Sequence, residues 1–266
     1  MNEPKKNFKI ITDTKARVIL PNTLTLIGVC IGLTSINFAL NQNYKLSIIA
    51  IVLAAIIDGL DGRIARLIRG TSKVGKELDS LTDVISFGVA PAFIMYFWIM
   101  NTFGKIGWLI SLIYVVCVAL RLARFNVNTG LEPSWTDNFF EGVPSPAGGI
   151  LVLSPLIYDV SGFDVINLNY KIITPVIFVI VSILLISKIP TYSMKKIVVP
   201  RSSTIFLLFG IVLLFGIFLI FPFKSLVVGA TVYLLTVPIS LFHYRKIKES
   251  RKDDSNWNDK EPEDVL

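Results

Sequence analysis

Long apolar runs alternate with short polar stretches along this chain of 266 residues, of which 53% are hydrophobic. An α-helix needs about 20 mostly apolar residues to cross a bilayer, and eight segments approach that length, although Pro, Ser or Asn interrupts the first, fifth and sixth. They lie near residues 20–40, 44–67, 80–100, 106–123, 144–158, 172–188, 204–222 and 225–243. The pattern predicts an all-α fold, a polytopic integral membrane bundle of about eight transmembrane helices.

The basic residues are divided unevenly between the two ends of such a bundle. With eight alternating spans, one end carries only four of the 26 Lys and Arg residues, namely Lys45, Lys105, Lys171 and Lys224. Cytoplasmic loops of membrane proteins are enriched in Lys and Arg, so we expect both termini in the cytoplasm. A basic rim beside anionic lipid accounts for the net charge of +7, and we therefore expect no nucleic-acid partner.

Four carboxylates interrupt two of the apolar runs. Asp58 and Asp61 are three residues apart, and Asp79 and Asp83 are four apart, so each pair lies on one face of a helix. Ionisable residues at such depth are costly and indicate a functional site by default. Two helices that present these pairs to each other form an oxygen-rich cage of the kind that hard divalent cations prefer. Neutralisation of a neighbouring basic loop is the simpler alternative, and it does not explain all four spacings.

Small and basic residues lie among the acids. Gly62, Ala65 and Gly75 let a bulky ligand approach the helix backbone closely. Positive charges suited to phosphate groups lie in the same stretch: Arg63, Arg66, Arg69, Lys73 and Lys76. The stretch therefore favours a site for a phosphorylated ligand and a divalent metal.

The stretch from Asp58 to Asp83 resembles the motif D-x2-D-G-x2-A-R-x8-G-x3-D-x3-D of the CDP-alcohol phosphatidyltransferases. All eight fixed positions are matched: Asp58, Asp61, Gly62, Ala65, Arg66, Gly75, Asp79 and Asp83. The resemblance implies an enzyme that transfers a phosphatidyl group from a CDP-linked lipid to an alcohol and releases CMP. It also implies a homodimer.

The resemblance assigns roles to these residues. The metal ligands for Mg²⁺ or Mn²⁺, two ions in one site, would be Asp58, Asp61, Asp79 and Asp83, with Asp83 also the catalytic base. The CDP-lipid would contact Asn22, Thr25, Gly62, Ala65, Arg66 and Gly75. Asn22 and Thr25 belong to a Pro-Asn-x2-Thr segment that resembles one near the nucleotide in these enzymes. Helix signals alone predict instead that Pro21 begins a helix and that Asn22 caps it.

Three further segments resemble the bacterial, membrane-embedded phosphatidylserine synthases within that family. They are Arg124-Phe125-Asn126, the element F-x-G-x-P-x-P-A at 140–147 and the element S-K-x-P-T-x-S at 187–193. This likeness implies CDP-diacylglycerol as donor and L-serine as acceptor. Cations for the serine carboxylate would come from Arg121, Arg124, Lys188 and Lys195, with Arg124 and Lys188 favoured. From the residues alone, the arginines are equally consistent with anchors at the membrane interface.

Alternatives remain open at this point. The acidic motif serves the shared donor, so glycerol 3-phosphate, inositol phosphate or choline could replace serine as acceptor. A cation transporter is the alternative from another class, although transporter sites tend to lie near the bilayer midplane.

The chain divides into four parts on this interpretation. We expect a basic cytoplasmic segment at 1–19 and a catalytic membrane domain at 20–200. Two transmembrane helices at 201–244 would act as scaffold or dimer surface, and a charged cytoplasmic tail at 245–266 would be disordered. No transit peptide is apparent, so we expect a multi-pass protein among the lipids of a prokaryotic plasma membrane, with its site facing the cytoplasm.

Overall fold

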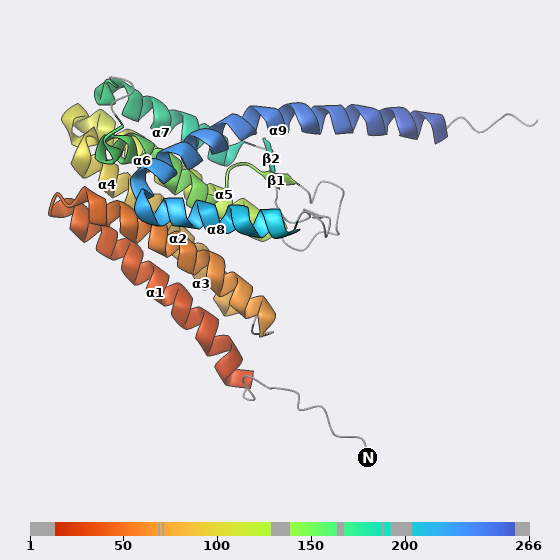
Figure 1. The fold of residues 1–266 in the computed structure, drawn as a ribbon, viewed down its shortest axis with the longest axis horizontal. Coiled ribbons are helices and arrows are strands. Elements are labelled where there is room, and N and C mark those ends of the chain that lie inside the picture. Colours follow the sequence, from red (N-terminus) through yellow and green to blue (C-terminus); the bar gives the residue numbers. More distant parts are fainter. Residues whose placement is uncertain are drawn as a thin grey trace, which may run out of the picture.

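The computed structural model describes residues 14–68, 70, 72–128, 139–163, 168–187, 189–192 and 204–258, and nearly all of this part is helical (Figure 1). In chain order, the helices are α1 Thr14–Leu40, α2 Tyr44–Leu67, α3 Lys73–Asp83, α4 Ala90–Trp98, α5 Lys105–Asn128, α6 Ser145–Ser161, α7 Tyr170–Ile186, α8 Thr204–Ile220 and α9 Pro222–Asn258. A π-helix, η1 Val84–Val89, joins α3 to α4, and a 3-10 turn, η2 Met100–Phe103, precedes α5.

Helices occupy all eight apolar segments of the sequence, which confirms the all-α polytopic membrane fold. Four helical stretches have the length and apolar composition to cross a membrane: Ile19–Leu40, Lys73–Trp98, Lys105–Val127 and Pro222–Leu241. Two shorter apolar helices are α7 and α8. The third span begins earlier than the hydrophobic pattern alone predicts, because Ser72 caps α3 by accepting a hydrogen bond from the Gly75 N–H at 2.9 Å.

The interior of the bundle is organised around α6. This helix contacts α2, α4, η1, α7 and α9, and residues such as Val152, Leu153 and Leu156 are almost fully buried. By contrast, α8 has no buried residue and packs mainly against α9. Exposed apolar side chains on α8 suit a lipid environment, where they need no protein partner.

Two short strands are added to the predicted all-α fold. β1 Phe139–Glu141 pairs antiparallel with β2 Pro190–Tyr192, and Phe140 lies opposite Thr191. The Gly142 N–H extends this pairing by donating to the Ile189 carbonyl at 2.9 Å. Gly142 has φ +75°, and a Cβ there would lie 2.9 Å from the Ser187 carbonyl oxygen, so both the turn and the close approach require glycine.

Two local predictions are wrong. Pro21 lies inside α1, which begins at Thr14, so Asn22 is an interior helix residue and not a cap. Within a membrane helix, neighbouring helices and side chains compensate for the hydrogen bond that an internal proline removes. At the other end, α9 continues to Asn258, so the first part of the tail predicted to be disordered is helical.

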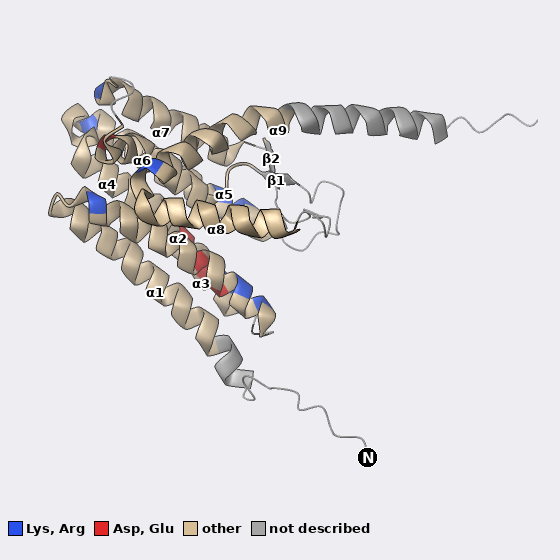
Figure 2. Ribbon diagram, viewed as in Figure 1, with Lys and Arg blue, Asp and Glu red and all other residues tan. Residues whose placement is uncertain are grey.

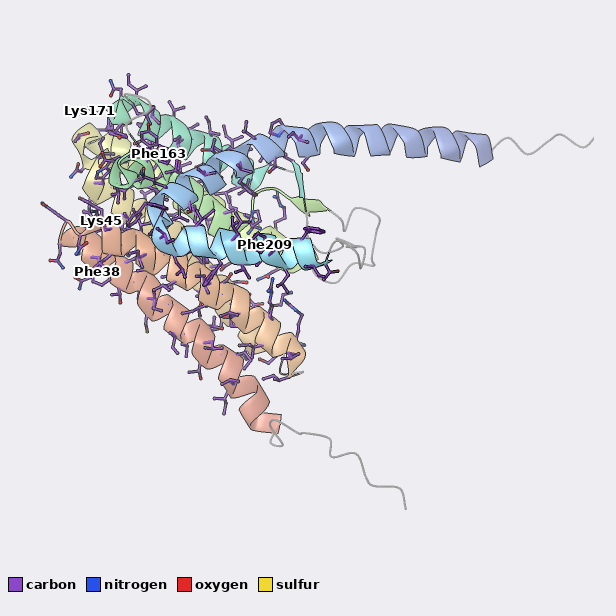
Figure 3. The ribbon with its side chains drawn as sticks, in the orientation of Figure 1. Phe38, Lys45, Phe163, Lys171 and Phe209 are labelled. Carbon is purple, nitrogen blue, oxygen red and sulfur yellow. The ribbon has the colours of Figure 1, made fainter. Side chains whose placement is uncertain are left out.

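The acidic motif lies nearer to one end of the bundle than to the other. Lys45 and Lys171 lie at the same end, away from the start of α3 (Figure 3). Basic residues also colour the first turns of α3 at the opposite end, next to acidic residues further along that helix (Figure 2). The acidic motif therefore lies toward the end of the bundle that includes the start of α3.

Candidate active site

The four predicted acids come together where α2 and α3 approach each other. Carboxylate oxygens of Asp58, Asp61 and Asp79 all lie within 4.8 Å of one another. The Asp83 carboxyl is within hydrogen-bonding reach of Asp58. The three- and four-residue spacings thus bring both pairs into one cluster, because each pair occupies a single face of its helix.

Unpaired oxygens make this cluster suitable for a cation. Asp61 Oδ1 and Asp83 Oδ1 are buried and have no hydrogen-bond partner among the described residues. The other Asp61 oxygen, Oδ2, accepts a hydrogen bond from the Thr25 hydroxyl at 2.7 Å. Buried charged oxygens are costly unless they are paired or bind a metal, and an all-oxygen donor set matches hard divalent ions. The residues present therefore fit a divalent cation.

A pocket of about 470 Å³ opens beside Asp61 and Asp79. It is lined by parts of α1, α2 and α3 together with the loop between the latter two. All six residues predicted to contact a CDP-lipid line it: Asn22, Thr25, Gly62, Ala65, Arg66 and Gly75. Pro21, Lys73 and Lys76 line the pocket too, and the two lysines were predicted as positive charges suited to phosphate. No sequence signal pointed to the lining residues Gly70 and Ser72. Arg69 lies outside the described residues.

Two glycines shape this pocket in different ways. A Cβ on Gly75 would lie 2.7 Å from Asn22 Oδ1 and 3.0 Å from Ser72 Oγ. Gly75 therefore makes room for the Asn22 amide, which in turn faces the pocket. A Cβ on Gly62 would meet only the Arg66 guanidinium, at 3.7 Å, so this face of α2 remains open toward a ligand.

Arg121 of α5 lies on another side of the acidic cluster. One of its guanidinium nitrogens donates to Ser145 Oγ at 2.6 Å, and Ser145 is fully buried at the start of α6. The Arg121 Nε is buried without a hydrogen-bond partner among the described residues. Arg121 is close enough to Asp83 to interact with it electrostatically. A cation with a spare donor thus lies beside the candidate base.

Arg124, one turn further along α5, binds backbone. Its guanidinium donates to the Ile186 carbonyl at 2.6 Å and to the Ser187 carbonyl at 3.4 Å, and it thereby caps the C-terminus of α7. Next to it, the Asn126 amide donates to Ser80 Oγ on α3 at 2.8 Å. Lys188 and Lys195, the other two cations predicted for serine, lie outside the described residues.

The three segments that carry the narrower resemblance therefore meet in space. Arg124 of the first segment holds Ser187 of the third, and β1 and Gly142 of the second pair with β2 and Ile189 of the third. Sequence reasoning missed Ser145 and also Tyr233 of α9, which interacts electrostatically with Arg121. The contact between α9 and α6 brings the C-terminal region to the site, and no local pattern signals it.

Comparison with sequence families places this fold and this cluster in a class. Residues 18–239 match the CDP-alcohol phosphatidyltransferase family, a span that includes α8 and the first half of α9. The chain belongs to that family. It is therefore a phosphotransferase of a group that depends on divalent metal, in keeping with the cluster of acids.

Individual relatives are similar over most of the chain. A CDP-diacylglycerol–serine O-phosphatidyltransferase of Mycobacterium leprae is 36% identical over 247 residues, which cover 91% of this chain and 80% of the relative. The enzyme of the same name from Helicobacter pylori is 37% identical over 179 residues, or 67% of this chain and 74% of the relative. An archaetidylserine synthase of Methanothermobacter thermautotrophicus is 33% identical over 177 residues, or 65% of this chain and 69% of the relative.

Proposed function

We propose that this protein is a phosphatidylserine synthase, which transfers the phosphatidyl group of CDP-diacylglycerol to the hydroxyl of L-serine and releases CMP. The observation that carries the proposal is the cluster of carboxylates beside a pocket that all six predicted CDP-lipid residues line. Arg121, which interacts electrostatically with Asp83, adds a cation for an acceptor carboxylate. The names of the relatives support serine as the acceptor. Both the bacterial name, CDP-diacylglycerol–serine O-phosphatidyltransferase, and the archaeal name, archaetidylserine synthase, contain serine, although they name different lipids.

The donor nucleotide would occupy the pocket beside Asp61 and Asp79. Its volume of about 470 Å³ is within the usual range for small-molecule sites. Arg66, Lys73 and Lys76 line the pocket and suit the negative charge of a pyrophosphate. Asn22, Gly62 and the residues that pack with them would surround the nucleotide, while the diacylglycerol chains remain in the bilayer.

The acids would organise the reaction. Asp58, Asp61, Asp79 and Asp83 would hold two Mg²⁺ or Mn²⁺ ions, which when bound neutralise the pyrophosphate and polarise the phosphoryl oxygens. Asp83 would accept the proton of the serine hydroxyl as its oxygen attacks the phosphorus that bears diacylglycerol. A new phosphorus–oxygen bond to serine forms, the bond to the CMP oxygen breaks, and CMP leaves from the pocket.

The acceptor would bind between the cluster and α5. Arg121 has a buried Nε that could donate to the serine carboxylate, and Ser145 holds the guanidinium in place. Arg124 would act mainly by positioning the segment after α7, because its donors contact the Ile186 and Ser187 carbonyls. Lys188 and Lys195 remain candidates for the same carboxylate, on the resemblance alone.

The site would face the cytoplasm of a prokaryotic cell from its plasma membrane, with both termini on that side. The sparse Lys and Arg residues of the other end, among them Lys45 and Lys171, support this orientation (Figure 3). There, CMP and serine can exchange with water while the lipid substrates stay in the membrane. The family resemblance also leads us to propose a homodimer.

A direct assay tests this function. Purified protein in detergent is given CDP-diacylglycerol and Mn²⁺ or Mg²⁺, and CMP release is followed with serine, glycerol 3-phosphate, inositol phosphate or choline. We expect CMP release only when serine is the acceptor, together with formation of phosphatidylserine. CMP release with another acceptor would refute serine as the acceptor and leave the phosphatidyl transfer reaction in place. Folded protein that releases no CMP with any acceptor, yet moves divalent ions across vesicle membranes, would favour a transporter.

A further inference from the structure

We propose that the Tyr114 hydroxyl of α5 positions Asp83 by stabilising the π-helical turn that directly follows it. The inference rests on the proposed metal site. Asp83 is the last residue of α3, and η1 begins at the next residue. Single π-helical turns are rare and occur often at functional sites. Tyr114 acts through this turn and not on the reacting atoms, so it is a positioning residue.

The reason for the turn lies in Pro91. In a regular α-helix, the N–H of residue 91 would donate to the Phe87 carbonyl, but proline has no N–H and its ring crowds that carbonyl. In the structure, the preceding Ala90 N–H reaches back five residues to the Ile85 carbonyl, the π-helical pattern. The Phe87 carbonyl then accepts a hydrogen bond from the Tyr114 hydroxyl at 2.7 Å. Tyr114 thus supplies the donor that Pro91 lacks.

The bond between the Tyr114 hydroxyl and the Phe87 carbonyl is shielded from water. Tyr114 and Phe87 are both 0% exposed, so water does not reach the bond. The widened turn is also closely packed against other helices. A Cβ on Gly149 of α6 would lie 3.3 Å from the Phe87 carbonyl oxygen, and one on Gly32 of α1 would lie 2.5 Å from Ser86 Oγ. Removal of the Tyr114 hydroxyl takes away a buried donor that water cannot replace, so the turn loses a stabilising contact.

A change in this turn would be transmitted to the acids. Each residue of an α-helix advances the side-chain direction by about 100°, so the extra residue of a π turn changes the phase between the two helices that it joins. Ile94 and Met95 of α4 are fully buried in the core and fix that helix. Because α4 is fixed, a change in phase would rotate α3 instead and would displace the side chains of Asp79 and Asp83.

The test compares two tyrosine hydroxyls that donate to the same continuous helix. Tyr114→Phe removes the bond to Phe87, whereas Tyr44→Phe removes a bond of 3.3 Å to the Phe97 carbonyl, near the end of α4 and beyond the turn. Binding of Mn²⁺ alone is measured by electron paramagnetic resonance of the free ion, and kcat is measured by CMP release. We expect Tyr114→Phe to weaken Mn²⁺ binding about tenfold and to lower kcat by about tenfold or more. We expect Tyr44→Phe to match the unmodified protein in both.

The outcomes separate this inference from the function on which it rests. Unchanged Mn²⁺ affinity and kcat in folded Tyr114→Phe would overturn it, as would equal losses in Tyr44→Phe. If Tyr114→Phe does not fold, Pro91→Ala is added to restore a backbone donor for Phe87, and recovery of folded, Mn²⁺-binding protein supports the inference while failure to recover refutes it. A protein that binds Mn²⁺ but does not use serine would overturn only the proposed acceptor.

Discussion

The two sides of the acidic cluster are built in different ways. On the pocket side, Asp61, Gly62, Arg66, Gly75 and neighbouring residues come from one continuous stretch of sequence, completed by α1. On the Arg121 side, residues from α5, α6, the segment after α7 and α9 converge from distant parts of the chain. The contrast matches the proposed chemistry, in which the acidic motif and its pocket bind the CDP-linked donor and the other side selects the acceptor.

The largest effect is expected where the two sides meet. Asp83→Asn removes the candidate base and one metal-binding oxygen, and we expect kcat for serine-dependent CMP release to fall by about a thousandfold or more. The matched control is Glu77→Gln, which neutralises an exposed acid of the same helix and should leave the rate within about twofold. An Asp83→Asn variant with more than a tenth of normal kcat would exclude Asp83 as the base.

A smaller effect is expected when the hydrogen bond that orients the candidate metal ligand Asp61, on the pocket side, is removed. Thr25→Val removes the hydrogen bond to Asp61 Oδ2 and leaves a similar side-chain volume. Groups that orient metal ligands are typically worth 10–100-fold in affinity, so we expect Mn²⁺ binding to weaken by about that factor. Thr23→Val is the control, because the Thr23 hydroxyl bonds only to the Ile19 carbonyl of its own helix among the described contacts. Equal Mn²⁺ affinities in the two variants would refute this role.

The mildest change alters the shape of the pocket but no charge. Gly75→Ala brings a Cβ to 2.7 Å from Asn22 Oδ1 and forces the amide to move. We expect the KM for CDP-diacylglycerol to rise about threefold to tenfold, since overpacking by one methyl group at the mild end of its range costs about 1 kcal/mol, while the KM for serine stays nearly constant. Gly59→Ala, where a Cβ meets nothing within 4 Å, is the control. A larger rise in the KM for serine than in the KM for CDP-diacylglycerol would contradict the position of Gly75 on the donor side of the cluster.

The contrast between a site side built from one stretch and a side built from distant segments also decides which features the sequence could predict. The length of the apolar runs was sufficient for the eight helical segments. The spacings of Asp58, Asp61, Asp79 and Asp83 were sufficient for the cluster, because helix geometry determines which residues share a face. Local signals failed at Asn22, since a proline in a helix interior resembles one at a helix start. They could not indicate the bond from Arg121 to Ser145 or the pairing of β1 with β2, which depend on tertiary packing.

The central claim is that donor and acceptor are recognised on different sides of the cluster, and two neutralising variants test it most directly. KM for CDP-diacylglycerol and KM for serine are measured for Arg66→Gln and Arg121→Gln, with Arg63→Gln, an exposed neighbour outside the pocket, as control. Hydrogen bonds between charged groups are worth about 1.5–3 kcal/mol, or roughly tenfold to a hundredfold in affinity. We expect Arg66→Gln to raise the lipid KM by this factor and Arg121→Gln to raise the serine KM, each with little change in the other. Two variants that raise the same KM, or both KM values equally, would contradict the account.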